Sequence, residues 1–253
     1  DIRRDDYYGN MRRLSEFDTR RNLAKFGKPV SEDGFADPRA TLPTVVNAGY
    51  SSGRNGIEIP AAFLQPPFYT PGADAGVNFC TLGAVIGHEI THGFDSSGGL
   101  YDAQGNVRDW WAPEDTKAFL ERSKNLVAQA AAYEVVPGTH LNGELSSGEN
   151  LADIGGLTLA YDALNRYLKS NPREDRRIDG MTPQQRCFVA WAQNWADKKQ
   201  PGMLEQEALT DGHPPGVYRM FAPAQNVAGF YETYGIKPGD RMWLDPKDRV
   251  SIW

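Results

Sequence analysis

The sequence has few cysteines and few histidines. Its 253 residues include two cysteines and four histidines, and the pairing C-x-x-C is absent. Two cysteines are too few for a disulfide framework, although they could still form a single bridge. Because neither the spacing nor the surroundings of Cys80 and Cys187 favour pairing, we expect both thiols to be free.

An excess of positive charge and long apolar runs are also absent. The chain has 27 Lys and Arg against 33 Asp and Glu, which gives a net charge of −6. Nucleic acids and anionic membrane surfaces select basic patches, so we expect neither as a partner. No apolar run approaches the ~18 residues of a membrane-spanning helix, so we expect no membrane segment in this chain.

The N-terminus, DIRRDDYYGNMRRLSEFD, has neither an initiator methionine nor the apolar core of a signal peptide. We therefore expect a processed or trimmed chain that has lost an upstream part. The length allows one substantial domain, and 40% hydrophobic with 24% charged residues is ordinary for a globular protein. Since no linker divides the chain, we expect one domain over residues 1–253.

The expected elements are mainly helical, with a small antiparallel sheet. The runs 43–50 and 56–60 flank SSGRN like the strands of a hairpin, and Pro60 ends the second run. Thr182 and Gln185 form a capping box that opens a helix. Loops are expected over 28–43, over 60–72 and around 138–148. Apolar periodicity indicates helices over 5–26, 81–94, 113–133, 149–168 and 182–198, and a helical patch at 223–231.

Two of the four histidines lie four residues apart in AVIGHEITHGFD, residues 84–95. Positions i and i+4 share a helix face, so His88 and His92 would direct two imidazoles at one point. Imidazole is a good zinc ligand, and Glu89 could reach a metal-bound water as a general base. The alternative is a surface helix with incidental histidines. The apolar flanks favour a buried setting, in which polar groups need partners.

A catalytic zinc site usually has three protein ligands and an open position. The third ligand could be His140, His213 or a carboxylate. The best candidate is SSGENLADIGGLTLAY, in which Glu149 and Asp153 are again i and i+4. One carboxylate could bind the metal while the other accepts a hydrogen bond from a ligand histidine. The alternative is that both are acids favoured at the start of a helix by its dipole.

Four ordered blocks of the sequence resemble the neprilysin family of zinc metallopeptidases, which includes endothelin-converting enzyme and bacterial PepO-type oligopeptidases. The blocks are VVNAGYSSGRNGIEIPAAFLQPPFY, VIGHEITHGFDSSGGLYDAQGNVRDWW, GENLADIGGL and DGHPPGVYR. The ending DRVSIW is similar to the C-termini of bacterial members. The resemblance covers nearly the whole chain. It implies an α+β, mainly helical catalytic domain with a thermolysin-like core and a small antiparallel sheet.

The resemblance also implies roles for the matched residues. One zinc ion would be bound by His88, His92 and Glu149. Glu89 would be the general base, and His213 would donate to the oxyanion of the tetrahedral intermediate. The carboxylates that orient the histidines would be Asp95 and Asp153. Substrate would be bound by Arg219 at a carbonyl, by Asn47 and Ala48 on an edge strand, and by an apolar leaving-group pocket of Phe63, Phe68, Val85 and Trp195.

Three departures from the family pattern stand out. Gly49 replaces a bulky residue, so we expect a more flexible strand and a wider subsite there. The long helical N-terminal region of the family is missing, and we expect it to be a second chain formed from the same protein or to have been excised. The cysteine near the C-terminus of animal members is also absent, which fits a bacterial protein, extracellular or periplasmic.

The sequence thus predicts a zinc metalloendopeptidase that cleaves oligopeptides on the amino side of hydrophobic residues. A zinc-bearing module that captures peptides without cutting them is an alternative from another class. The presence of Glu89 and His213 argues against it, because a general base and an oxyanion donor serve turnover rather than binding. A third possibility is a fragment that stays inactive until it meets its N-terminal half.

Overall fold

The computed structural model describes residues 1–28 and 42–251 and divides the chain into two compact units, Asp1–Ala40 and Thr41–Trp253. In the first unit, helix α1 (Tyr7–Leu23) confirms the helix expected there, and the Asp6 carboxylate caps its start. No residue of α1 is buried. Most of the loop expected over 28–43 lies outside the described residues. That both units belong to one catalytic domain stays a prediction.

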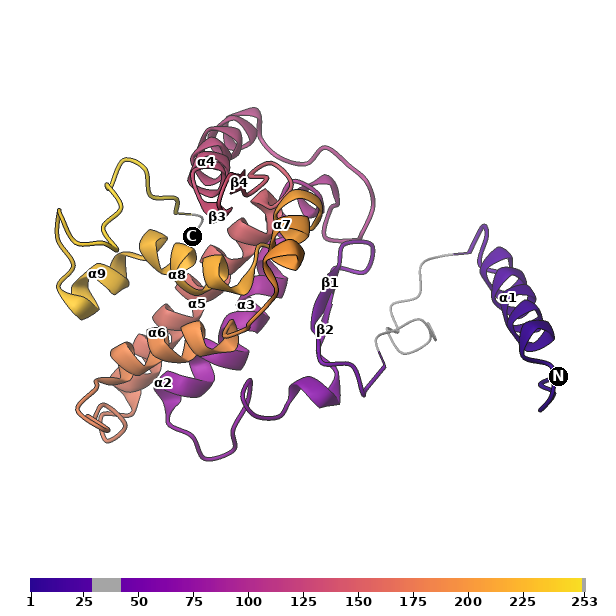
Figure 1. The fold of residues 1–253 in the computed structure, drawn as a ribbon, viewed down its shortest axis with the longest axis horizontal. Coiled ribbons are helices and arrows are strands. Elements are labelled where there is room, and N and C mark those ends of the chain that lie inside the picture. Colours follow the sequence, from indigo (N-terminus) through magenta and orange to yellow (C-terminus); the bar gives the residue numbers. More distant parts are fainter. Residues whose placement is uncertain (29–41, 252–253) are drawn as a thin grey trace. The chain divides into compact units, whose positions relative to one another are not determined.

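Two central helices of the second unit, α3 (Ala84–Thr91) and α5 (Ser147–Ser170), pack closely against each other (Figure 1). Glycines make this approach possible. A Cβ atom on Gly87 would lie 2.9 Å from the Cα atom of Gly156, closer than real side chains allow. The expected helices over 81–94 and 149–168 are therefore confirmed, and they are held backbone to backbone.

The helix that carries α3 begins earlier than expected. Its first turn is α2 (Ala75–Asn78), capped by Asp74, and a π-helical stretch η3 (Phe79–Gly83) joins it to α3. A 3₁₀ turn, η4 (His92–Phe94), follows α3 directly, so His92 lies at the junction between them.

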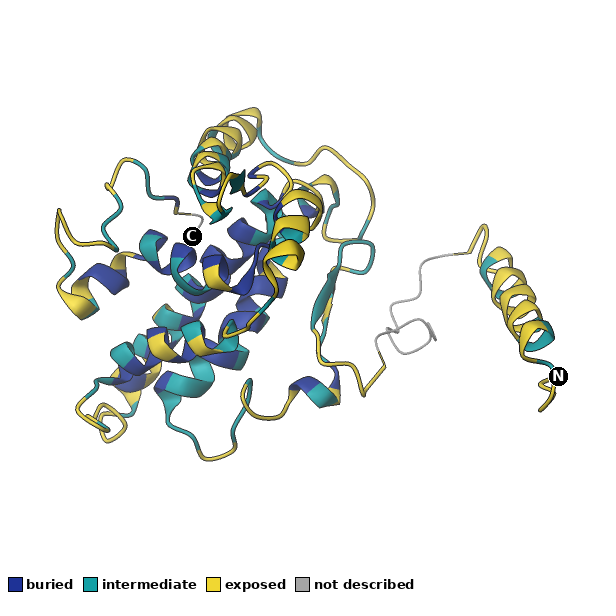
Figure 2. Ribbon diagram, viewed as in Figure 1, coloured by how far each residue is buried: buried dark blue, intermediate teal, exposed yellow. Residues whose placement is uncertain are grey.

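The remaining helices of the second unit surround this central pair (Figure 1). The predicted capping box of Thr182 and Gln185 is confirmed at the start of α6. The main apolar core lies between α5, α6, α8 and α9, where Leu157, Leu164 and Trp191 are almost fully buried (Figure 2). The bounds are α4 (Pro113–Ala131), α6 (Pro183–Asn194), α7 (Pro201–Thr210), α8 (Gly216–Asn226) and α9 (Ala228–Tyr234), with short 3₁₀ turns η2 (Ala61–Phe63) and η5 (Gly98–Leu100).

The expected hairpin is confirmed. Strands β1 (Gly49–Ser51) and β2 (Gly56–Glu58) pair antiparallel, with Tyr50 opposite Ile57. A second antiparallel pair, β3 (Glu134–Val136) and β4 (Thr139–His140), lies partly in the segment expected to be loop. The mainly helical α+β class with small antiparallel sheets is confirmed.

Three expectations were wrong. Cys80 and Cys187 are not free but form a disulfide, because η3 and α6 pack with the Cα atoms of the two residues 5.0 Å apart. The helix expected over 182–198 ends at Asn194, and Pro201 starts a separate helix, α7, that was not expected. The patch at 223–231 is two helices, since the backbone turns extended at Val227.

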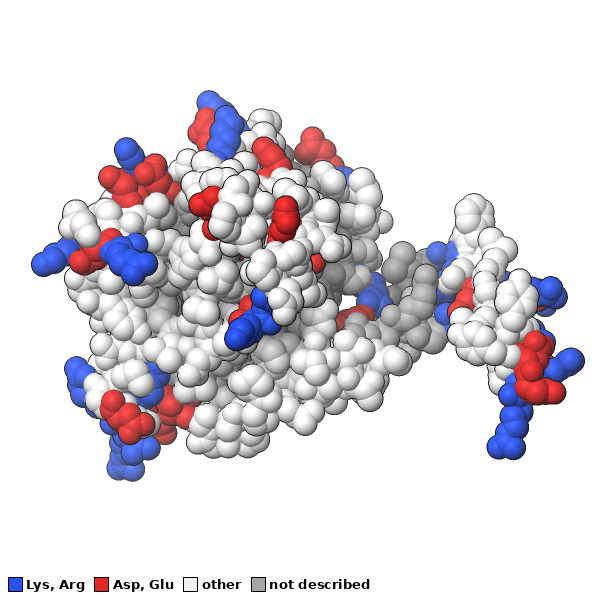
Figure 3. All heavy atoms as spheres, viewed as in Figure 1, with Lys and Arg blue, Asp and Glu red and all other residues white. Residues whose placement is uncertain are grey.

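No helix within the described ranges is both long and apolar enough to span a lipid bilayer. On the face of the second unit drawn in Figure 3, positive and negative side chains lie near one another and are separated by uncharged surface. Several charged side chains are buried, and most of these lie in the site described next.

Candidate active site

Three side chains from two helices converge on one point. The Nε2 atoms of His88 and His92 are 3.0 Å apart. Glu149, near the start of α5, places Oε2 at 3.3 Å from Nε2 of His88 and Oε1 at 3.5 Å from Nε2 of His92. The close packing of α3 on α5 is what brings this distant carboxylate to the histidine pair.

The other nitrogen of each imidazole is held by a carboxylate. Nδ1 of His88 is 2.8 Å from Oδ1 of Asp153, and Nδ1 of His92 is 2.7 Å from Oδ2 of Asp95. An ionised carboxylate accepts hydrogen bonds but donates none, so each Nδ1 carries the proton. When both rings are neutral, the two Nε2 atoms that face each other therefore carry lone pairs, which repel. A cation bound between them would remove this repulsion.

The electrostatics of the site favour positive charge. Burial lowers the pKa of His88, but its hydrogen bonds to Asp153 and Glu149 outweigh burial and raise this pKa to about 9. Burial likewise opposes the charge on Asp153, yet the Arg219 guanidinium and the His88 hydrogen bond lower its pKa to about 2. The pKa of Asp95 is lowered as well, because hydrogen bonds from His92 and from two backbone N–H groups outweigh burial.

Glu89 is the buried carboxylate next to the histidine pair. Burial raises its pKa above the ordinary glutamate value, although the nearby histidines oppose this. One possible ligand atom from each of His88, Glu89 and His92 lies within 4.8 Å of the others. Glu89 is thus close enough to act on a molecule bound at the histidine pair, and its raised pKa suits proton transfer.

Arg219 of α8 is a buried guanidinium with a bidentate contact to Asp153. Its Nε and Nη2 donate to the two Asp153 oxygens at 2.8 and 2.7 Å, and Nη2 lies 3.5 Å from Oε2 of Glu149. Its guanidinium stacks over Trp195 at 3.7 Å. The backbone carbonyl of Arg219 accepts a hydrogen bond from the Trp191 indole. The arginine therefore links α5, α6 and α8 beneath the site.

His213 lies at the open side, with 62% of its side chain exposed. Its Nε2 is 3.2 Å from Oε1 of Glu149. Asp211 holds it in place, since Oδ1 accepts the backbone N–H of His213 at 2.9 Å and lies 3.1 Å from Nδ1. His140, a candidate third ligand in the sequence, lies elsewhere, exposed on β4 with Nδ1 beside a backbone carbonyl.

A cavity of about 580 Å³ gathers every site residue predicted from the sequence. Asn47 and Ala48 line it from just before β1, rather than within the strand as expected. The rings of Phe63 and Phe68 stack at 4.1 Å in its wall. The other predicted residues that line it are Val85, His88, Glu89, His92, Asp95, Glu149, Asp153, Trp195, His213 and Arg219.

Several lining residues were not predicted from the sequence, among them Trp191 and Asn194. Both lie on α6. They are four and one residues before Trp195, so the helical spacing of Trp191 and Trp195 was a usable signal for this wall.

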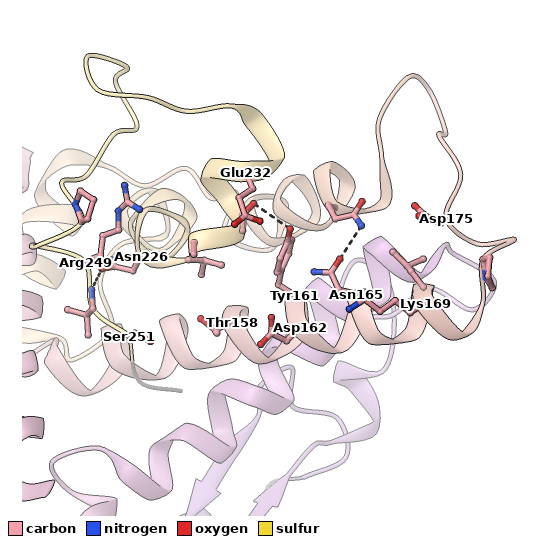
Figure 4. Close-up of a pocket in the computed structure, with 18 residues that line it drawn as sticks. Thr158, Tyr161, Asp162, Asn165, Lys169, Asp175, Asn226, Glu232, Arg249 and Ser251 are labelled. Carbon is pink, nitrogen blue, oxygen red and sulfur yellow. Dashed lines mark hydrogen bonds between the residues drawn. The ribbon is translucent and has the colours of Figure 1, made fainter.

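A second cavity, of about 1100 Å³, is larger but has different chemistry (Figure 4). It lies along α5 and α9 and beside the C-terminal segment, with Tyr161, Asp162 and Glu232 near its middle and Arg249 at one end. None of the residues predicted for the site lines it. Size alone would select this cavity, whereas the convergent imidazoles and carboxylates select the smaller one.

Comparison with known proteins gives a consistent result. Residues 47–250 match Peptidase family M13. Neprilysin-11 of Caenorhabditis elegans is 39% identical, over 98% of this chain and 29% of that protein. Human neprilysin is 36% identical, over 98% of this chain and 33% of its own length. The chain thus spans about a third of the length of the curated relatives it matches.

Solved structures show the same similarity. Zinc metalloprotease ZMP1 of Mycobacterium tuberculosis, in complex with an inhibitor, superposes with a TM-score of 0.91 at 42% identity, covering 100% of this chain and 38% of that one. PEPO from Lactobacillus rhamnosis superposes with a TM-score of 0.84 at 32% identity, covering 99% of this chain and 37% of that one. The thermolysin-like class expected for the core agrees with these neighbours.

Proposed function

Since the chain belongs to Peptidase family M13, we propose that it forms the catalytic part of a zinc metalloendopeptidase that hydrolyses oligopeptides. The observation that carries this proposal is the pair of Nε2 atoms facing each other beside Glu149, with buried Glu89 next to them. Two imidazole nitrogens with free lone pairs beside a carboxylate are a ligand set that suits a divalent ion such as zinc.

In this proposal His88, His92 and Glu149 hold one zinc ion, and Asp95 and Asp153 fix the two imidazoles. When bound, the ion supplies Lewis-acid polarisation of a carbonyl and makes a water molecule more acidic.

The chain's own residues perform the proton transfers and the binding. Glu89 takes a proton from the attacking water and passes it to the leaving amine, for which its raised pKa is suited. His213 donates to the oxyanion from the open side. Arg219 uses Nε and Nη2 on Asp153, so we assign its Nη1 to a substrate carbonyl.

Substrate backbone is held by strand addition. The sheet that contains β1 has two strands in the described part of the chain, so one edge of β1 is open. Asn47 and Ala48 lead into that edge and line the same cavity as the histidines. An extended peptide can pair there through its main chain, with little regard to its side chains. This arrangement suits an enzyme that acts on many oligopeptides.

Selectivity comes from the apolar wall on the leaving-group side. Phe63, Phe68, Val85 and Trp195 line the cavity there, so we propose a hydrophobic residue directly after the cleaved bond. Burial of a large apolar side chain contributes ~1.5–3 kcal/mol.

Two further observations support a proposed location and a proposed partner. A buried disulfide between Cys80 and Cys187 favours an oxidising compartment, which supports an extracellular or periplasmic bacterial location. Exposed apolar side chains on α1, such as Phe17, support a partner surface, for which we propose the N-terminal half of the same protein as a second chain.

The test is cleavage of an internally quenched peptide with Phe after the scissile bond. We expect zinc-loaded protein to cleave it, chelator to stop cleavage, and the Glu89→Gln variant to bind zinc without cleaving. His140→Ala, altered at an exposed histidine outside the cavity, is the matched control and should cleave normally. A folded, zinc-loaded protein that binds the peptide but never cleaves it would indicate a peptide-binding module instead.

A further inference from the structure

The apolar wall on the leaving-group side contains one side chain of another kind. Asn194, the last residue of α6, lines the cavity together with Trp191 and Trp195 of the same helix end. Its side-chain nitrogen and oxygen are both buried, and neither has a hydrogen-bond partner among residues 1–28 and 42–251. Because both atoms are unpaired, this finding does not depend on which of them is the nitrogen.

A neighbouring atom shares this condition. The indole Nε1 of Trp195 is also buried and without a partner in the described part of the chain. Asn194 and Trp195 also line a further, smaller cavity of about 210 Å³, which shares His213 and Arg219 with the active-site cavity. Two donors and one acceptor are therefore unpaired on consecutive residues, both of which line the active-site cavity.

Helix capping does not explain the asparagine. Asparagine at a helix end often bonds the last backbone groups, but here those bonds are made by the backbone itself. The N–H of Trp195 donates to the carbonyl of Ala192, and the N–H of Ala196 donates to that of Gln193. The amide of Asn194 has no structural task that the described residues reveal.

We propose that Asn194 determines which side chains this pocket prefers, a proposal that rests on the peptidase function and refines its specificity. The favoured residue after the cleaved bond has an apolar body and a hydrogen-bonding tip, such as Tyr rather than Phe. The body packs against Phe63, Phe68 and Val85, and the tip pairs with the Asn194 amide.

The physical basis is the difference between paired and unpaired buried groups. A purely apolar side chain would leave the amide without water and without a partner, whereas a hydroxyl or amide tip satisfies it. Pockets that carry a few polar groups in an apolar lining gain their selectivity in this way.

The experiment compares matched peptides with three variants of the protein. The peptides differ only after the scissile bond, as the pairs Tyr and Phe, Gln and Met, and Thr and Val, which cover three sizes. The proteins are wild type, Asn194→Leu, which keeps the size of the side chain but removes the amide, and Gln193→Leu. Gln193 is exposed and lines neither the active-site cavity nor the smaller cavity beside it, so it is the matched control.

Of the three peptide pairs, one has the side-chain size that the pocket accepts best. For that pair, we expect wild type and Gln193→Leu to cleave the polar peptide with a kcat/KM about three- to tenfold higher than that of its apolar partner. Asn194→Leu should lose this preference or reverse it, with its effect on KM and kcat differing between the two members. Equal ratios in Asn194→Leu and wild type at all three sizes would overturn the proposal.

Equilibrium binding of the leaving-group products, short peptides that begin with Tyr or Phe, separates this proposal from the proposed function. If wild type cleaves nothing yet prefers the Tyr product through Asn194, the peptidase function fails and the pocket assignment stands. If it cleaves, but neither cleavage nor binding depends on Asn194, only the pocket assignment fails. If it neither cleaves nor distinguishes the products, both fail.

Discussion

The Nε2 atoms of His88 and His92 face each other at 3.0 Å, while a carboxylate fixes the Nδ1 atom of each ring. When both imidazoles are neutral, the lone pairs of the two Nε2 atoms point at the same space and repel each other. Without a bound cation or proton this arrangement is unfavourable. The site is thus built for positive charge before any ligand arrives, and its consequences for stability and metal binding can be measured.

Metal removal should lower the stability of the fold. A ligand that binds only the folded state stabilises it by about 4 kcal/mol when present at about a thousand times its Kd. We expect chelator to lower the thermal midpoint of unfolding by several degrees and added zinc to restore it. Circular dichroism melts of wild type and His140→Ala should show the same shift. A midpoint unaffected by chelator in wild type would argue against a metal at this position.

The contact between Asp153 and Arg219 should be strongly coupled. Both side chains are buried, and removing Arg219 leaves the Asp153 carboxylate with His88 as its remaining partner. Breaking a buried ion pair typically costs about 3–5 kcal/mol. We expect Arg219→Met to lower the free energy of unfolding by that amount in urea titrations. Arg12→Met breaks only an exposed pair with Glu16 and should change it by less than about 1 kcal/mol. Similar losses in the two variants would contradict a buried ion pair.

Adding a single methyl group at Gly156 should disrupt the close packing of α3 on α5. A Cβ atom on Gly156 would lie 2.6 Å from the backbone nitrogen of His88 and would also contact the carbonyl oxygen of Ala84. We expect Gly156→Ala to lower the free energy of unfolding by about 1–3 kcal/mol and to weaken zinc binding, because the helices must separate.

The matched control for that change is Gly202→Ala in α7. Nothing lies within 4 Å of the Cβ atom it would add, so alanine should be neutral or slightly stabilising there. Equal stability of the two variants would show that α3 and α5 do not need the glycine.

The disulfide should contribute measurably to stability. Cys80 and Cys187 close a loop that spans 107 residues of sequence separation. Removing a native disulfide typically costs about 2–5 kcal/mol, mainly by releasing the unfolded chain. We expect the double variant Cys80→Ala, Cys187→Ala to lose that amount in urea titrations without reductant. An unchanged free energy of unfolding would contradict a bond that forms in the native protein.

Local patterns predicted the parts of the site that lie within one helix. The spacing of His88 and His92, and that of Glu149 and Asp153, follows from helical geometry, and both pairs lie where that geometry requires. The convergence of the two pairs came from the family resemblance, because it depends on α3 packing against α5 through Gly87 and Gly156.

Other features depend on contacts that no local pattern contains. The bond between Cys80 and Cys187 requires η3 to pack beside α6, and two isolated cysteines carry no sign of this. Helix α7 was not predicted, although Pro201 is well suited to a first helical turn. Asn194 was missed because its chemistry depends on having no partner, which is a property of the packed structure.

Zinc content of purified variants tests the central claim most directly, namely that two imidazoles and the distant Glu149 bind one metal ion. We expect about one zinc per chain in wild type, as for a three-ligand catalytic site. Glu89→Gln should keep its zinc and lose cleavage, whereas Glu149→Gln should lose much of its zinc. Full zinc occupancy in Glu149→Gln, equal to that of wild type, would contradict the account.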